Sequence, residues 1–163
     1  MDHRHKHRFM IKKTIILICT ALGVLCGCQK APTGITKDTP KYSGLMSVLY
    51  EGENFNQEDI KVQVAFAEDE KTIDIKFLKV KFAPAMPVSL DVTVMGIPAE
   101  KNQDGSWTFS GDDITPWALG GPYDTYKAND LHGTLTDSRI EFSLGFFNTK
   151  KSENYPTTYS GTK

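Results

Sequence analysis

Apolar and polar residues alternate with a period of two through most of the chain after residue 40. Successive side chains of a β-strand point to opposite faces, so this alternation predicts strands with one buried face. The apolar positions fall in these runs: Tyr42, Met46, Val48 and Tyr50; Ile60, Val62, Val64 and Phe66; Ile73, Ile75 and Phe77; Val88, Leu90, Val92 and Val94; Ile140, Phe142 and Leu144. No stretch supports a long amphipathic helix, so the sequence predicts an all-β domain.

The third run changes phase in its middle. After Phe77 the apolar positions continue at Leu78, Val80 and Phe82, so one extra residue separates the two halves of the run. A single extra residue in one strand of an antiparallel pair is a β-bulge. We therefore expect a bulge here, with Leu78, Val80 and Phe82 on the same face as the earlier apolar residues.

Short segments rich in turn-forming residues separate the runs, at residues 68–71, 104–105, 120–122 and 136–138. Such connections are typical of antiparallel hairpins. About eight short strands joined in sequential order predict a single up-and-down meander, and closure into a barrel is the surest way to hide its edges. We expect residues 41–161 to form a closed antiparallel barrel in which the segments around Tyr42 and Tyr159 are neighbours.

The residues before this domain predict an export signal. Lys12 and Lys13 precede an apolar run at residues 15–25, which is too short to span a bilayer and ends in small residues. The sequence Leu25-Cys26-Gly27-Cys28 resembles the lipobox of bacterial lipoproteins, in which the last cysteine is diacylated and becomes the new N-terminus. We predict a signal peptide at residues 1–27 and lipidation of Cys28; cleavage nearby as a general secretory signal is the alternative.

Removal of residues 1–27 changes both the thiols and the charge of the chain. Of the three cysteines only Cys28 would be left, and its lipid leaves no thiol for a disulfide or a metal site. Residues 1–27 hold five of the 19 basic and one of the 20 acidic residues, so the rest has a net charge of −5. This acidic balance argues against nucleic acid as a partner. Residues 28–40 contain two prolines and no apolar period, which predicts a short tether before a domain at residues 41–163.

Several segments carry a resemblance to a known family. The domain begins with Lys41-Tyr42-Ser43-Gly44 and ends with Thr158-Tyr159-Ser160-Gly161, with residues 104–107 and 129–135 between them. In this the chain resembles the calycin-like, lipocalin-like β-barrel lipoproteins of gut-dwelling Gram-negative anaerobes. The resemblance implies a closed barrel of about eight strands with the two Tyr-Ser-Gly segments near the seam, and it implies no activity. A barrel of about this size is either packed solid or holds one small ligand.

The sequence offers little catalytic chemistry. His132 is the only histidine after residue 27, and a polar outward position on a strand explains it without a catalytic role. Asp112 and Asp113 are adjacent, so on a strand their carboxylates face opposite ways and make a poor acid/base pair. No phosphate loop, nucleophile elbow or metal motif is present. We therefore predict no catalytic residue, no metal site and no cofactor.

Aromatic residues give the best candidate binding site. Trp107, Trp117, Tyr123 and Tyr126 lie close together in the chain, and the last three surround a Gly-Gly-Pro segment at residues 120–122. Amphipathic rings beside a tight turn suit a small, partly apolar ligand at a barrel mouth. Rings that simply plug the end of the barrel are the alternative.

Two functions follow from these features. The first is a non-enzymatic lipoprotein that binds a small, partly apolar ligand in or at the mouth of the barrel. The second is a structural or interaction lipoprotein with a solid barrel that docks onto an envelope protein. A cavity beside Trp107 or Trp117 favours the first, and a filled interior with an exposed apolar patch favours the second. In both, the lipid on Cys28 provides the membrane contact, and Gln29 leans toward an outer-membrane anchor that faces the periplasm.

Overall fold

The computed structural model describes residues 33–163 and is all-β, with ten strands and no helix in that range. No helix in this part of the chain is therefore long and apolar enough to cross a membrane. The eight long strands are β1 (Lys41–Tyr50), β2 (Glu53–Phe66), β3 (Thr72–Val80), β4 (Leu90–Lys101), β5 (Trp107–Gly111), β8 (Tyr126–Leu135), β9 (Arg139–Asn148) and β10 (Glu153–Thr162). Two short strands, β6 (Trp117–Ala118) and β7 (Gly121–Pro122), form a small hairpin.

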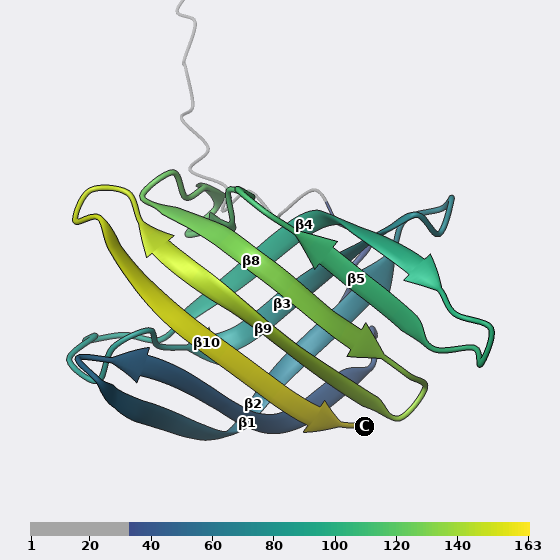
Figure 1. Ribbon diagram of the computed structural model, residues 1–163, viewed down its shortest axis with the longest axis horizontal. Helices are drawn as coiled ribbons and strands as arrows, with labels where there is room; N and C mark the ends of the chain where they lie inside the picture. Colours follow the sequence, from purple (N-terminus) through teal and green to yellow (C-terminus); the bar gives the residue numbers. More distant parts are fainter. Residues whose placement is uncertain (1–32) are drawn as a thin grey trace, which may run out of the picture.

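The long strands close into a barrel. Each pairs antiparallel with the next in sequence, through the order β1, β2, β3, β4, β5, β8, β9 and β10. The last pairing joins β10 back to β1, from Ser43 opposite Thr162 to Val48 opposite Thr157. Figure 1 shows the wall formed by β8, β9 and β10 crossing in front of β2, β3 and β4. The prediction of a closed up-and-down barrel of about eight strands is confirmed.

The barrel has two ends of different character. The termini end carries the start of β1, the C-terminus and the turns at residues 67–71, 102–106 and 136–138. The loop end carries the turn at residues 51–52, the loop 81–89, the segment 112–125 and the turn at residues 149–152. In Figure 1 the termini end lies at the right and the loop end at the left.

Glycine makes the seam between β1 and β10 possible. Gly44 pairs with Gly161, and a Cβ atom added at Gly44 would overlap the backbone of Ser160 and Gly161. The ring of Tyr159 lies against Gly161, and its hydroxyl donates toward the carbonyl oxygens of Tyr42 and Ile60, each at 2.9 Å. The two Tyr-Ser-Gly segments therefore meet at the seam, as the sequence predicts.

Side chains fill the interior of the barrel. The ring of Phe77 packs edge-on against Phe142 at 5.5 Å and against Phe146 at 5.9 Å between centroids, and Phe82 lies 4.2 Å from Phe146. Eight further apolar side chains are fully closed to water: Met46, Val48, Val62, Ile73, Val80, Ile97, Ala128 and Ile140. Since a water-sized void would expose the side chains around it, the middle of the barrel is a packed core.

The bulge predicted in the third run is confirmed, with one correction. Phe77 pairs with Val92 and Val80 with Leu90, so two residues of β3 oppose one residue of β4. Lys79 in the bulge has a φ of 57°. Leu78, however, pairs with the exposed Lys61 on the outer face, and only Val80 and Phe82 return to the core. The prediction that Leu78 faces inward was wrong because the phase changes after Leu78.

The fourth run begins later than predicted. Val88 lies in the loop before β4 with 59% of its surface exposed, and pairing starts only at Leu90. Pro84 and Pro87 precede it, and proline has no N–H to donate to a ladder. Residues 83–89 therefore form a largely exposed loop rather than the start of a strand.

Residues 33–40 lie along the outside of the barrel near the termini end. Ile35 is buried, and the side-chain amide of Gln63 donates to the carbonyl oxygens of Thr36 and Thr39 at 3.0 and 2.8 Å. Gly34 approaches Ala65 on β2. The predicted signal peptide, Cys28 and the first part of the predicted tether lie outside the described residues.

Candidate functional site

The structure separates the four predicted site residues. Tyr126 begins β8, whereas Trp107 pairs with Leu135 at the other end of the same strand, roughly 30 Å away at the rise of a β-strand. Trp107 therefore lies at the termini end, and Trp117, Tyr123 and Tyr126 lie at the loop end. Adjacent positions in the chain do not make one site here, because β5 and the segment that follows it run from one end of the barrel to the other.

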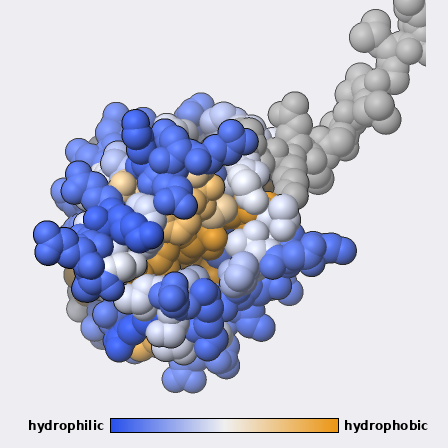
Figure 2. Space-filling model, turned by 90° about the vertical axis from the view of Figure 1, so that its right-hand side faces the viewer, coloured by the Kyte–Doolittle hydropathy of each residue, from blue (hydrophilic) through white to orange (hydrophobic). Residues whose placement is uncertain are grey.

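At the termini end Trp107 closes the barrel together with residues from other strands. Its ring lies 4.5 Å from that of Phe66, and the Lys101 amino group sits 5.4 Å above it. A recess of about 160 Å³ is lined by Trp107, Phe66, Val64, Tyr42 and Leu135 among others. Figure 2 looks onto this end and shows an apolar centre surrounded by hydrophilic side chains.

At the loop end tyrosine rings form a chain across the mouth. Tyr123 stacks on Tyr126 with centroids 5.4 Å apart and planes at 28°, and Tyr126 lies 6.4 Å from Tyr155. Tyr155 in turn lies nearly parallel to Tyr50, at 6.2 Å and 12°. Tyr50 and Tyr155 are not among the predicted site residues because they are far from residues 117–126 in the chain. Tyr50 ends a predicted alternating run, which was the available signal for it, whereas Tyr155 belongs to no such run.

Trp117 belongs to the β6–β7 hairpin, which pairs with the start of β4 through Thr93 and Val92. The indole is half-buried, and its Nε1–H is buried without a partner among residues 33–163. The tight turn is at Leu119 and Gly120, with φ of 54° and 85°, the two positive values that a type I′ turn requires. It therefore begins one residue before the Gly-Gly-Pro segment.

Two uncharged apolar segments lie next to each other at the loop end. Leu119 at the hairpin tip is 74% exposed, and Val88 in the loop 81–89 is 59% exposed. Residues 82–90 and 114–123 contain no charged side chain. Because β6 pairs with β4 directly after that loop, the two segments are neighbours. We call them the apolar loops; they carry the two most exposed large apolar side chains among the described residues.

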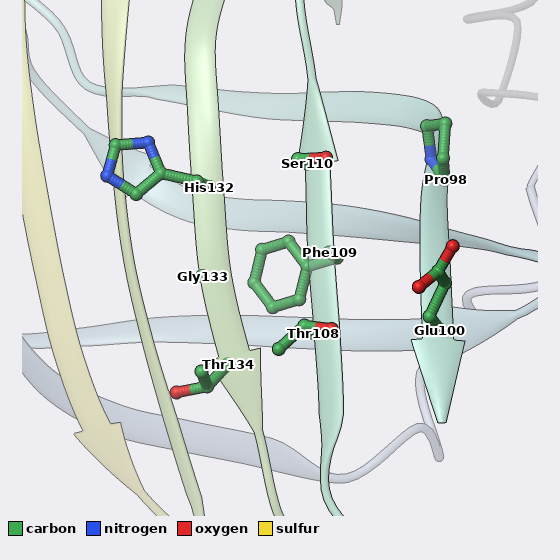
Figure 3. A pocket seen from close by; sticks show the side chains of 8 residues that line it. All are labelled: Pro98, Glu100, Thr108, Phe109, Ser110, His132, Gly133 and Thr134. Atoms are coloured by element: carbon green, nitrogen blue, oxygen red, sulfur yellow. The ribbon is translucent and has the colours of Figure 1, made fainter. Parts of the chain in front are cut away.

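A hollow on the outer wall surrounds His132. Figure 3 shows its lining: Pro98 and Glu100 from β4, Thr108, Phe109 and Ser110 from β5, and His132, Gly133 and Thr134 from β8. The carbonyl oxygen of Asp130 accepts from His132 Nδ1–H at 2.9 Å, which leaves Nε2 to accept from the Ser143 hydroxyl at 2.9 Å. β9 pairs with β10 and with β8, and the register of the β8–β9 ladder shifts between Asn129 and His132. His132 Nδ1 is oriented by a backbone carbonyl, where a Ser-His-Asp triad has a carboxylate.

Metal-binding side chains do not converge in the described part of the chain. Within residues 33–163 no group of three or more His, Cys, Asp or Glu residues lies close enough to hold a metal ion. Asp112 and Asp113 have other contacts: an Asp112 carboxylate oxygen accepts from the Asp130 N–H at 3.1 Å, and Asp113 pairs with Lys127 at 3.2 Å. Both aspartates thus hold the segment 112–125 against β8.

Comparison with known proteins supports the architecture. No family model and no curated protein matches the chain. The crystal structure of a candidate outer membrane protein from Bacteroides fragilis is similar to it, with a TM-score of 0.57 and 15% sequence identity. The match covers 77% of this chain and 51% of that one, so the chain spans about half the length of that protein. The likeness extends to the fold, and membership of the calycin-like lipoprotein family stays a prediction.

Proposed function

We propose that this chain is a lipid-anchored protein of the cell envelope that docks onto another envelope protein through its apolar loops. The observation that carries the proposal is the combination of a filled barrel with exposed Leu119 and Val88 on adjoining uncharged segments. An exposed apolar patch is expensive to keep in water unless it meets a partner. The partner that fits presents an apolar groove with few charges.

The path of residues 33–40 indicates which end of the barrel would face the membrane. Ile35, Thr36 and Thr39 lie against β2 at the termini end. Cys28 precedes Thr33 by five residues, which span at most about 18 Å. A lipid on Cys28 would therefore hold the termini end close to the membrane and direct the apolar loops away from it, toward a protein rather than toward the same bilayer. Similarity to a candidate outer membrane protein is consistent with an envelope location.

The packing of the interior limits where the barrel could bind a small ligand, which is the other predicted function. Since the interior is filled, a small ligand would have to bind at one end of the barrel. A catalytic role has no support from the Ser143–His132 pair, and the net charge of −5 after residue 27 gives nucleic acid no basic surface. We therefore place ligand binding within the barrel behind docking, and propose a non-catalytic protein.

The anchor itself can be tested directly. We expect mass spectrometry of the protein from the membrane fraction to find a mature chain that starts at Cys28 and carries acyl groups. A Cys28→Ser variant, which keeps size and polarity but cannot form the thioether, is expected to leave the membrane fraction or retain its signal peptide. A native N-terminus at another residue, without acylation, would disprove the lipoprotein hypothesis.

Docking predicts contacts that are confined to the apolar loops. A photo-crosslinking amino acid at position 119 or 88 is expected to capture one envelope protein in intact cells, whereas the same group at exposed Asp137, at the termini end, is not. Leu119→Asp should abolish capture from position 88 and change the stability by no more than about 0.5 kcal/mol, because an exposed side chain is replaced and Asp tolerates a positive φ. Crosslinks to lipid alone, or equal capture from position 137, would contradict the proposal.

A further inference from the structure

A second surface of the loop end combines part of one apolar loop with aromatic and acidic residues of β1 and β2. A recess of about 590 Å³ opens beside the β1–β2 turn and is lined by Tyr50, Glu51, Glu53, Asn54, Phe55, Pro84 and Ala85. Tyr50 and Phe55 are half-buried and packed against the core, so their rings form a firm wall. Pro84 and Ala85 of the loop 81–89 form the facing side.

The edge of this recess is negatively charged. Glu51 lies in the turn and Glu53 follows it directly, and no lysine, arginine or histidine contributes to the lining. Among the described residues neither carboxylate takes part in an ion pair. Positive φ angles of 50° at Glu51 and 84° at Gly52 define a tight hairpin turn. This turn fixes the backbone positions from which the Glu51 and Glu53 side chains extend. A hydrogen bond to Glu51 raises the pKa of Tyr50, in keeping with a carboxylate near the Tyr50 hydroxyl.

A smaller recess lies on the other side of Tyr50 and helps to decide between ligands. It measures about 320 Å³ and includes Tyr155, Glu153 and Lys151. There Glu153 accepts a hydrogen bond from the Tyr155 hydroxyl and lies 3.9 Å from the Lys151 amino group. Its negative charge is therefore already paired with a cation. Glu51 lines both recesses, but the larger one adds Glu53 and has no lysine in its lining, so it is the better place for a cation from outside.

We propose that the recess between Tyr50 and Pro84 binds a small organic cation, such as a quaternary ammonium group. The faces of aromatic rings attract cations through the ring quadrupole, and the attraction grows as the cation loses water. Here the Tyr50 and Phe55 rings supply the faces, and Glu51 and Glu53 supply the opposite charge. Pro84 and Ala85 offer apolar contact to methyl groups without competing for hydrogen bonds. Pro84 and Ala85 belong to one of the apolar loops, but the lining includes neither Leu119 nor Val88, and the site does not depend on docking.

Choline and its uncharged isostere 3,3-dimethylbutanol test the proposal by calorimetric titration of the full-length mature protein in a nonionic detergent. We expect choline to bind with a millimolar or lower Kd and the alcohol at least about tenfold more weakly, since both have the same shape and only one is charged. Choline binding should weaken as salt is added, because the carboxylates are exposed.

Variants separate the roles of the ring and the charge. Tyr50→Leu and Glu51→Gln should each weaken choline binding about three-fold or more, whereas Tyr50→Phe, which keeps the ring, should bind as the wild type does. Glu100→Gln, an exposed carboxylate on the outer wall, is the control for net charge and should have no effect. Melting temperatures check that each variant is folded. Equal binding of the alcohol, a Tyr50→Leu variant that binds normally, or no choline binding to the wild type would each overturn the proposal.

Discussion

A Gly44→Ala variant is expected to lose about 3 kcal/mol or more of its free energy of unfolding, a large part of the typical stability of a domain. The added methyl group would overlap the carbonyl oxygen of Ser160 and the Cα of Gly161, which are backbone atoms and cannot turn aside as a side chain does. Relief requires the β1–β10 seam to open, and that pairing is the one that closes the barrel. Urea unfolding followed by circular dichroism measures the loss.

Gly121→Ala is the matched control for this experiment. Gly121 also lies in a strand, but a Cβ atom there meets nothing within 4 Å. Its stability should stay within about 0.5 kcal/mol of the wild type. If both variants unfold at the same urea concentration, the seam is looser than the structure shows, and closure of the barrel does not depend on close backbone contact at Gly44.

The fold was predictable because its signals are local. Alternation in runs such as Ile140, Phe142 and Leu144 reports which face of a strand is buried, and the turn residues between runs report where the chain reverses. Closure followed from the need to cover two free edges. The bulge in β3 was also visible in the sequence, as a change of phase in the apolar alternation. That change alone did not show that Leu78 lies on the outer face.

The candidate sites were less predictable because they combine distant segments. Tyr50 and Tyr155 are neighbours only because β10 pairs with β1 to close the barrel. Phe66 contacts Trp107 only because the end of β2 and the start of β5 both lie at the termini end. Nearness along the chain suggested that Trp107 belongs with Trp117, yet they lie at opposite ends. An alternating pattern places a side chain on a face, but strand stagger and bulges decide which faces meet at an end.

Packing inside the barrel makes the second large prediction. Phe77→Ala is expected to cost about 3–5 kcal/mol of unfolding free energy, because it removes a fully buried ring and the surrounding strands relax only in part. Phe77 is 1% exposed and contacts Phe142 and Phe146 from the opposite wall. Phe66→Ala, at the rim and 36% exposed, should cost clearly less and serves as the control in the same urea titration.

A small apolar molecule then distinguishes a filled barrel from a hollow one. The cavity left by Phe77→Ala is apolar, and such cavities bind benzene-sized molecules. We expect benzene to raise the melting temperature of Phe77→Ala and to leave that of the wild type unchanged, since the wild-type interior has no room for it. A wild-type protein that benzene stabilises, together with a small cost for Phe77→Ala, would mean that the barrel holds space in its interior. Binding of a small apolar ligand inside the barrel would then become the better explanation than docking through the apolar loops.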